Sequence, residues 1–309
     1  MRAAERCRLL VVHNAKAGRA GNRGLPGVAA ALEARGARIR MTEIGSIDAA
    51  ERLADARAWD AVVAAGGDGT LRAVLRQVHA SSVPVACVPA GTGNVFAHEV
   101  GLPRDPAALA EVILNGPTVA VRGGLVGNEP FFLMAGVGFD AAIVARLDQR
   151  LKQRIGKLAY AGPMVRALVA ARPELDVRID GTPHAADWIV VQRARHYAGG
   201  FVLAPGASLL EPVLVAVLFK ANSRLGRLGQ LLAVATGRLK NAPGVHVVRC
   251  ETVDVASAMP VPVEADGDDA ALTPVRIRSD GPVAQLIVPH DYTGRERERL
   301  RACAYNSAN

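Results

Sequence analysis

Aromatic residues are scarce in this chain, making up 4% of its 309 residues. Proteins that hold single-stranded nucleic acid usually do so with stacked aromatic side chains, so we expect no nucleic-acid partner. No apolar run approaches the roughly 18 residues that a membrane-spanning helix needs, and no secretory signal is visible at the start. We therefore expect the chain to meet any lipid from the aqueous side.

Signals for disulfides, zinc and the common nucleotide sites are also missing. The four cysteines form no C-x-x-C pair, and none has a histidine at a zinc-binding spacing. Reduced thiols are the default for such a set, which favours a cytoplasmic location. The signatures G-x-x-x-x-G-K-S/T, G-x-G-x-x-G and H-R-D are absent, so P-loop, dinucleotide and protein-kinase sites lose support.

The chain carries a formal charge of +8. Such a surface favours an anionic partner, and nucleotide phosphates or an anionic lipid surface would both fit. Free use of arginine without any such role explains the charge about equally well. Charge alone therefore does not choose the partner.

The pattern of predicted secondary structure changes near residue 118. Predicted strands at 9–13, 38–43, 61–65 and 83–88 alternate with helical stretches, which predicts a parallel sheet covered by helices. From about residue 118, short β-branched runs separated by Gly, Pro and Asp predict an antiparallel sandwich or barrel, interrupted by helical stretches at 141–171 and 223–239. We place an α/β domain at 1–117 and a β domain at 118–290. The tail, 291–309, is expected to pack back on the first domain.

Three glycine-containing loops follow predicted strands of the first domain, at 14–18, 66–70 and 91–94. The carboxyl ends of parallel strands lie at one edge of a sheet, so a single ligand could touch all three loops. Glycine lets backbone N–H groups approach a phosphate closely, and Asp68 would suit Mg²⁺ or its water shell. Ordinary turn chemistry explains one such loop, but three at successive strand ends favour a phosphate site.

These loops resemble those of the diacylglycerol kinase catalytic family. The segments G-G-D-G-T-L-R at 66–72 and P-A-G-T-G-N-V-F-A-H-E-V-G-L-P at 89–103 resemble its nucleotide and lipid-kinase motifs. Later segments, at 134–141, 156–160, 197–207 and 264–268, extend the resemblance over residues 8–290. The resemblance implies a phosphofructokinase-like α/β domain, an antiparallel β-sandwich domain and an active site between them.

The resemblance also implies roles for individual residues. Asp268, where the family has Glu, would accept the proton of the acceptor hydroxyl, with Asp266 beside it and Asp68 completing the catalytic acids. A structural metal would fall at Ser208, Glu211 and Val213. The stretch departs from the family there, and Arg193 stands where the family has Asn. The implied nucleotide contacts are Asn14, Ala15, Lys16, Ala17, Gly18, Thr42, Gly66, Gly67, Asp68, Gly69, Thr70, Leu71, Arg72, Gly91, Thr92, Gly93 and Asn94.

Together these features predict a kinase that uses ATP and Mg²⁺ to phosphorylate a lipid hydroxyl. A kinase for a soluble substrate, like the NAD kinases, and an inactive nucleotide- or lipid-binding protein are the alternatives. Taken alone, Asp-Gly at 266–267 favours a hairpin turn over a catalytic role, and the family resemblance reverses that order. The basic stretch at 146–157 would suit either an anionic membrane surface or a solvated helix. A homodimer stays open.

Overall fold

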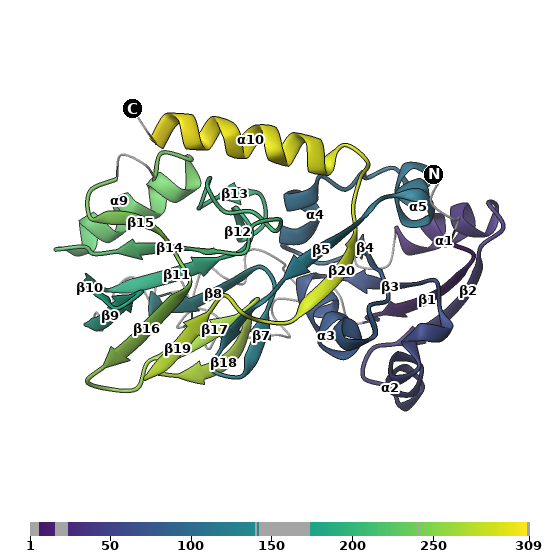
Figure 1. Cartoon of the computed structure of the whole chain (residues 1–309), viewed down its shortest axis with the longest axis horizontal. Coiled ribbons are helices and arrows are strands. Elements are labelled where there is room, and N and C mark those ends of the chain that lie inside the picture. Colours follow the sequence, from purple (N-terminus) through teal and green to yellow (C-terminus); the bar gives the residue numbers. More distant parts are fainter. Residues whose placement is uncertain (1–5, 16–23, 140, 142–173, 240–241, 308–309) are drawn as a thin grey trace. The chain divides into compact units, whose positions relative to one another are not determined.

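The computed structural model describes residues 6–15, 24–139, 141, 174–239 and 242–307 (Figure 1). The chain divides into two compact units. The first contains Met1–Val121 and Pro282–Asn309, and the second contains Arg122–Gly281. The first is an α/β unit and the second an antiparallel β-sandwich, so the predicted fold class is confirmed. No helix in these described ranges is long and apolar enough to cross a bilayer.

The α/β unit is built on one six-stranded sheet with the order β2-β1-β3-β4-β20-β5. Its strands β1 to β4 pair in parallel, and β20 pairs with β4 in the same direction. The two central strands, β3 and β4, consist mostly of small or β-branched apolar residues that are almost all buried, as a parallel sheet covered on both faces requires. The strand bounds are β1 Arg8–His13, β2 Arg38–Glu43, β3 Ala61–Gly66, β4 Val85–Pro89, β5 Thr118–Arg122 and β20 Val283–Ile287.

Helices cover this sheet. Helices α1 and α5 pack against each other and share one core with β1, β3 and β4, while α3 packs on β3 beside α2. Their starts follow local chemistry: Ser46 caps α2 by accepting the N–H of Ala49 at 3.0 Å, and Asp105 caps α5. The helices are α1 Leu25–Glu33, α2 Ile47–Ala54, α3 Asp68–Val78, α4 Val95–Val100, α5 Pro106–Asn115 and α10 Tyr292–Ser307, with 3₁₀ turns at Ala56–Ala58 and His79–Ser81.

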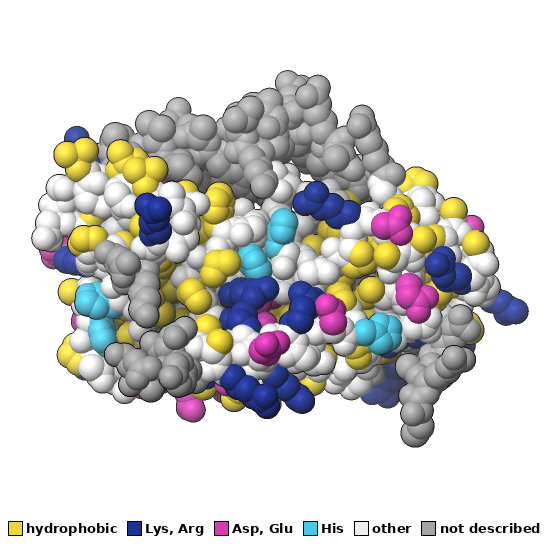
Figure 2. Space-filling model, turned by 90° about the horizontal axis from the view of Figure 1, so that it is seen from above, with side chains coloured by type: hydrophobic (Ala, Val, Ile, Leu, Met, Phe, Trp, Pro, Cys, Tyr) yellow, Lys and Arg dark blue, Asp and Glu magenta, His cyan; other side chains and the backbone are white. Residues whose placement is uncertain are grey.

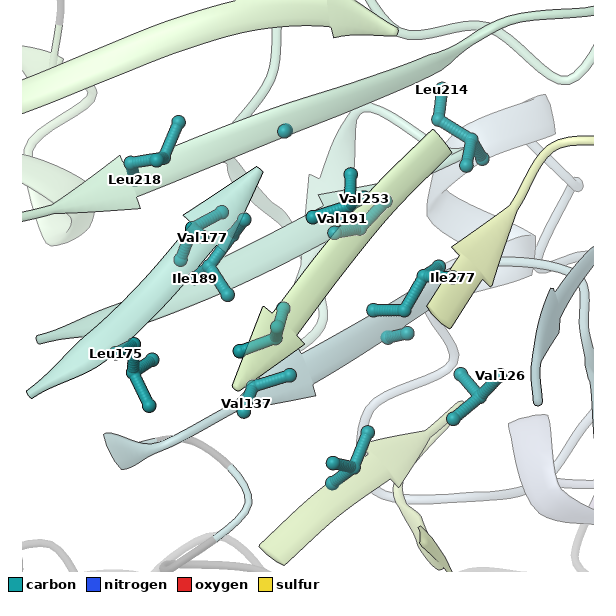
Figure 3. Close-up of a cluster of buried hydrophobic side chains, with 14 of the residues drawn as sticks. Val126, Val137, Leu175, Val177, Ile189, Val191, Leu214, Leu218, Val253 and Ile277 are labelled. Atoms are coloured by element: carbon teal, nitrogen blue, oxygen red, sulfur yellow. The ribbon is translucent and has the colours of Figure 1, made fainter. Parts of the chain in front are cut away.

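The sandwich unit consists of two six-stranded antiparallel sheets. Their orders are β10-β9-β16-β19-β6-β7 and β15-β14-β11-β8-β17-β18. Residues from both sheets form one buried core, and alternate positions such as Ile189 and Val191 point into it (Figure 3). The strands are β6 Gly124–Val126, β7 Glu129–Phe131, β8 Met134–Val137, β9 Leu175–Ile179, β10 Thr182–Ala186, β11 Trp188–Gln192, β14 Leu214–Phe219, β15 Val245–Cys250, β16 Thr252–Ser257, β17 Pro262–Ala265, β18 Asp268–Leu272 and β19 Val275–Arg278.

Two short elements complete the sandwich unit. A small ribbon pairs β12 (His196–Tyr197) with β13 (Phe201–Val202), and helix α9 (Arg224–Ala235) follows β14. Helix α9 lies inside the helical stretch predicted at 223–239. The helix predicted at 141–171, including the basic stretch at 146–157, falls almost entirely outside the described residues.

Two strands lie in a different sheet from the one predicted. The sequence predicts one β domain over 118–290, but β5 (Thr118–Arg122) and β20 (Val283–Ile287) belong to the first sheet. The chain returns from the sandwich at Pro282 and inserts β20 between β4 and β5. A short β-branched run carries no local mark of its sheet, because long-range pairing decides it.

Candidate functional site

The predicted loops begin at one edge of the parallel sheet. His13 lies opposite Ala65 in the pairing of β1 with β3, and Gly66 lies opposite Pro89 in the pairing of β3 with β4. Beyond the strands, the N–H of Asn14 donates to the carbonyl of Ala65 at 3.0 Å. The loops after β1, β3 and β4 therefore start side by side at the same level.

Glycine allows the loops after β3 and β4 to touch. A β-carbon at Gly91 would lie 2.4 Å from Cα of Gly67, too close for any side chain. A β-carbon at Gly66 would lie 2.2 Å from the hydroxyl oxygen of Thr70. The N–H of Ala90 donates to the carbonyl of Gly66 at 2.8 Å. The glycines of both motifs thus serve close backbone approach as well as turning.

Asn94 shapes the loop before α4. Its backbone has a left-handed φ of 51°, which Asn adopts more readily than most residues. Its side-chain oxygen accepts the N–H of Gly91 at 2.8 Å, and its side-chain nitrogen donates to the Gly91 carbonyl at 2.9 Å. This pair of bonds closes the 91–94 loop into a compact turn.

Asp68 joins these two loops. Its carboxylate accepts the N–H groups of Val95 at 2.9 Å and Phe96 at 3.0 Å, which are the first two residues of α4. Burial raises the pKa of the Asp68 carboxyl, and these backbone hydrogen bonds oppose that rise. The Asp68 side chain therefore fixes the start of α4, a structural role that the sequence did not suggest.

The remaining predicted nucleotide contacts differ in their surroundings. Thr70 accepts a long hydrogen bond from the side-chain nitrogen of Asn14, at 3.4 Å, so the first and second loops are also linked. Thr42 lies on β2, where its hydroxyl is 3.3 Å from that of Ser46. Leu71 and Arg72 are buried along α3. Thr92 and Gly93 are half-buried, Ala15 lies in a turn, Gly69 is exposed, and Lys16, Ala17 and Gly18 lie outside the described residues.

The acidic pair of the second unit occupies a hairpin. Asp266 and Gly267 connect β17 to β18, and both have positive φ values, 50° and 87°, as a type I′ turn requires. The Asp266 carboxylate is buried and accepts the N–H groups of Phe132, Leu133 and Met134 at 2.8, 2.8 and 2.9 Å. Asp266 thus anchors this hairpin to the connection between β7 and β8.

Asp268 has the opposite environment. It is the first residue of β18, pairs in register with Ala265, and is exposed. Glu264, which sequence reasoning gave no role, is fully buried on β17 and accepts the N–H of Gly267 at 2.7 Å. The sequence could have predicted a role for Glu264, because a carboxylate within an apolar strand two residues before Asp266 is unusual. The buried acids hold the turn, and the exposed acid is the one able to reach a ligand.

The predicted metal position does not fit a metal. The Ser208 hydroxyl accepts the N–H of Leu210 at 3.2 Å, and the Glu211 carboxylate pairs with Arg249 at 3.0 Å. Val213 offers only a main-chain carbonyl. In the described part of the chain, no three His, Cys, Asp or Glu side chains come together as a metal site would need. The expectation at Ser208, Glu211 and Val213 is therefore replaced by a different arrangement.

Arg193 supplies the positive charge at this place. Its guanidinium is fully buried and donates to the carbonyls of Glu211 at 3.0 Å, Val213 at 3.2 Å and Gly123 at 3.0 Å. A further bond reaches the carbonyl of Ser279. Desolvation lowers the pKa of Arg193 to about 10, so the group stays charged at neutral pH. An arginine side chain thus takes the place that a metal ion was expected to fill.

Comparisons with known proteins agree with this geometry. A family model described as the diacylglycerol kinase catalytic domain matches residues 8–126. A second, described as the YegS C-terminal NAD kinase beta sandwich-like domain, matches residues 134–288. The two matches meet close to the change from the first unit to the second.

Individual relatives carry related names. A diacylglycerol kinase from Mycobacterium tuberculosis is 30% identical over 244 residues, which cover 76% of this chain and 78% of that one. A YegS-like lipid kinase from Pseudomonas aeruginosa is 32% identical over 240 residues, covering 74% and 78%. The crystal structure of a diacylglycerol kinase from Bacillus anthracis aligns with a TM-score of 0.67 at 16% identity, covering 94% and 99%, and supports the fold.

Proposed function

Because the chain belongs to the diacylglycerol kinase catalytic family, we propose that it transfers the γ-phosphoryl group of ATP to the hydroxyl group of a lipid. One observation carries the proposal: three strand ends bring their loops together at one edge, where Gly67 and Gly91 touch. Such an edge is where open α/β sheets bind their ligands.

The nucleotide would lie across these loops. Backbone N–H groups of the loops after β1, β3 and β4, and the N-terminal end of the eleven-residue helix α3, would face the phosphates. Hydroxyl groups of Thr70 and Thr92 would donate to phosphate oxygens. Mg²⁺ would enter with the nucleotide and neutralise charge on its phosphates. Asp68, by holding the start of α4, would keep the 91–94 loop in position for this contact.

Asp268 would accept the proton of the attacking hydroxyl. The hydroxyl oxygen forms a bond to the γ-phosphorus, the bond from that phosphorus to the bridging oxygen breaks, and ADP leaves. Asp268 is exposed, whereas Asp266 and Glu264 are buried and hydrogen-bonded to backbone N–H groups. Asp266 and Glu264 would therefore position the hairpin and leave the proton transfer to Asp268.

Replacing Asp268 with Asn tests this assignment. The amide cannot accept the proton, so turnover should fall about 10²–10⁴-fold, the usual range for general-base loss. ATP affinity, measured by calorimetry, should stay within about twofold. Asp269→Asn is the matched control, because Asp269 is the next residue on β18, is also exposed, and points to the other side of the strand. Equal turnover in both variants would contradict the assignment.

The acceptor itself is open to direct identification. Incubation with radiolabelled ATP and a total lipid extract should label one lipid class, and the labelled product names the acceptor alcohol. Labelling of NAD in the absence of lipid would instead support a soluble-substrate kinase. ATP binding with no transfer to any extract would support an inactive binding protein.

A further inference from the structure

Helix α9 of the sandwich unit packs Leu231 and Val234 against the core, but it also buries two polar side chains and exposes three leucines. Its buried residues include Arg227 and Gln230, which are 4% and 2% exposed. Its exposed residues include Leu225, Leu228 and Leu232, at 80%, 41% and 57%. A surface helix normally buries its leucines and exposes its polar side chains. The exposure of three leucines on a helix that buries an arginine and a glutamine therefore requires an explanation.

Hydrogen bonds from the buried side of α9 fix the rotation of the helix about its own axis. The side-chain nitrogen of Gln230 donates to the carbonyls of Lys220 at 3.1 Å and Pro243 at 3.0 Å. Ser223 caps the first turn by accepting the N–H of Gly226 at 3.0 Å. Rotating the helix so that the leucines were buried would break the Gln230 bonds and remove the donor from these two part-buried carbonyls.

The exposed leucines share one side of the helix. Positions 225, 228 and 232 follow the i, i+3, i+7 spacing, which places them in one stripe opposite Arg227, Gln230 and Val234. We call Leu225, Leu228 and Leu232 the leucine face. Isolated surface leucines are ordinary, but a continuous apolar stripe marks an interaction surface.

Two exposed arginines lie at the ends of α9. The segment 212–250 contains six Lys and Arg and no Asp or Glu, but Lys220 and Arg249 pair with Asp187 and Glu211, and Arg227 is buried. Arg224, at the start of α9, and Arg238, just beyond its end, are both exposed. Figure 2 shows scattered hydrophobic side chains and isolated Lys or Arg side chains toward the left, where Figure 1 places α9, with His and Asp or Glu side chains at the margin. Leucines bordered by arginines match the chemistry of an anionic membrane interface.

We propose that the leucine face docks the protein on an anionic lipid bilayer. The inference deepens the proposed function, because a kinase that has no described membrane-spanning helix needs another way to reach a lipid acceptor. Charge disfavours a second copy of the chain as the occupant, since pairing two such faces would bring like-charged arginines together. A bilayer offers apolar contact to the leucines and anionic headgroups to the arginines.

Vesicle sedimentation without nucleotide tests the proposal. The full chain should sediment with vesicles of equal parts phosphatidylglycerol and phosphatidylcholine, less with pure phosphatidylcholine, and less at high salt. The double variant Leu225→Glu, Leu228→Glu should bind the mixed vesicles at least about tenfold more weakly. Both side chains are exposed, so folding should be kept, and circular dichroism verifies it. Met259→Glu is the control, because Met259 is 75% exposed elsewhere on the same unit.

Three outcomes would overturn the docking surface. They are unchanged vesicle binding by the double variant, equal loss in Met259→Glu, and a wild-type dimer that the double variant converts to monomer in light scattering. A short-chain, water-soluble diacylglycerol separates docking from catalysis. Phosphoryl transfer to this soluble substrate, without binding to vesicles, would refute the docking proposal but not the kinase. Vesicle binding without transfer to any lipid would leave docking in place and refute the kinase.

Discussion

Arg193 bonds to four carbonyl groups from three separate parts of the sandwich unit. Gly123 precedes β6, Ser279 follows β19, and Glu211 and Val213 lie in the loop before β14. The resemblance to the diacylglycerol kinase family implied a metal at Ser208, Glu211 and Val213. The sequence could not show that the cation comes from a side chain fifteen or more positions earlier.

We expect removal of metal ions to leave the stability of the sandwich unit unchanged. EDTA should leave the thermal unfolding midpoint of the wild type unchanged, because Arg193 already supplies the charge. Arg193→Met should cost on the order of 3–5 kcal/mol, since it leaves several buried carbonyls without a donor. Calorimetry measures both effects.

Arg249→Met is the matched control for this prediction. Arg249 also touches this loop, through Glu211, but its side chain is 53% exposed. An exposed ion pair contributes less than about 1 kcal/mol. A wild-type midpoint that drops in EDTA, or an Arg193→Met chain as stable as Arg249→Met, would show that a metal holds the loop after all.

At the scale of elements, the loops after β3 and β4 act as one structure because glycines let their backbones touch. Gly91→Ala would place a β-carbon 2.4 Å from Cα of Gly67, and backbone atoms cannot give way as a flexible side chain can. We expect a loss of about 1–3 kcal/mol in the free energy of unfolding, the usual cost of overpacking. Urea unfolding of the intact chain measures it.

Gly69→Ala provides the comparison within the same motif. A β-carbon at Gly69 meets nothing within 4 Å, and the residue lies in helix α3. Alanine should therefore be neutral or stabilise by up to about 1 kcal/mol. Similar losses at Gly69 and Gly91 would mean that the loops do not rely on this contact.

Much of this region could be predicted from the sequence. Strand, glycine loop and helix follow one another in the printed order, and parallel strands place their loops at one edge. The hairpin turn at Asp266 and Gly267 could likewise be predicted from the sequence. What could not be predicted were contacts between distant segments: Asp68 with α4, and Asp266 with residues more than 130 positions earlier. No local pattern encodes such partners.

At the scale of the whole molecule, chain order and structural units do not coincide. Strand β20 comes after every strand of the sandwich, yet Leu286 pairs with Val85 of β4 in the first sheet. The composition of β20 resembles that of its predecessors, which is why sequence alone assigned it to the sandwich. The first unit therefore depends on residues from both ends of the chain.

Two buried residues nine positions apart should consequently destabilise different units. Leu286→Ala on β20 and Ile277→Ala on β19 both remove a fully buried aliphatic side chain, at a cost of about 2–5 kcal/mol each. Native-state hydrogen exchange with mass spectrometry reads out each segment separately. Leu286→Ala should accelerate exchange in β3 and β4, some 200 residues away in the sequence, and spare β9 and β16. Ile277→Ala should do the reverse, because its side chain lies in the sandwich core. Faster exchange in β9 and β16 after Leu286→Ala, with β4 unaffected, would place β20 in the sandwich and restore the division by chain order.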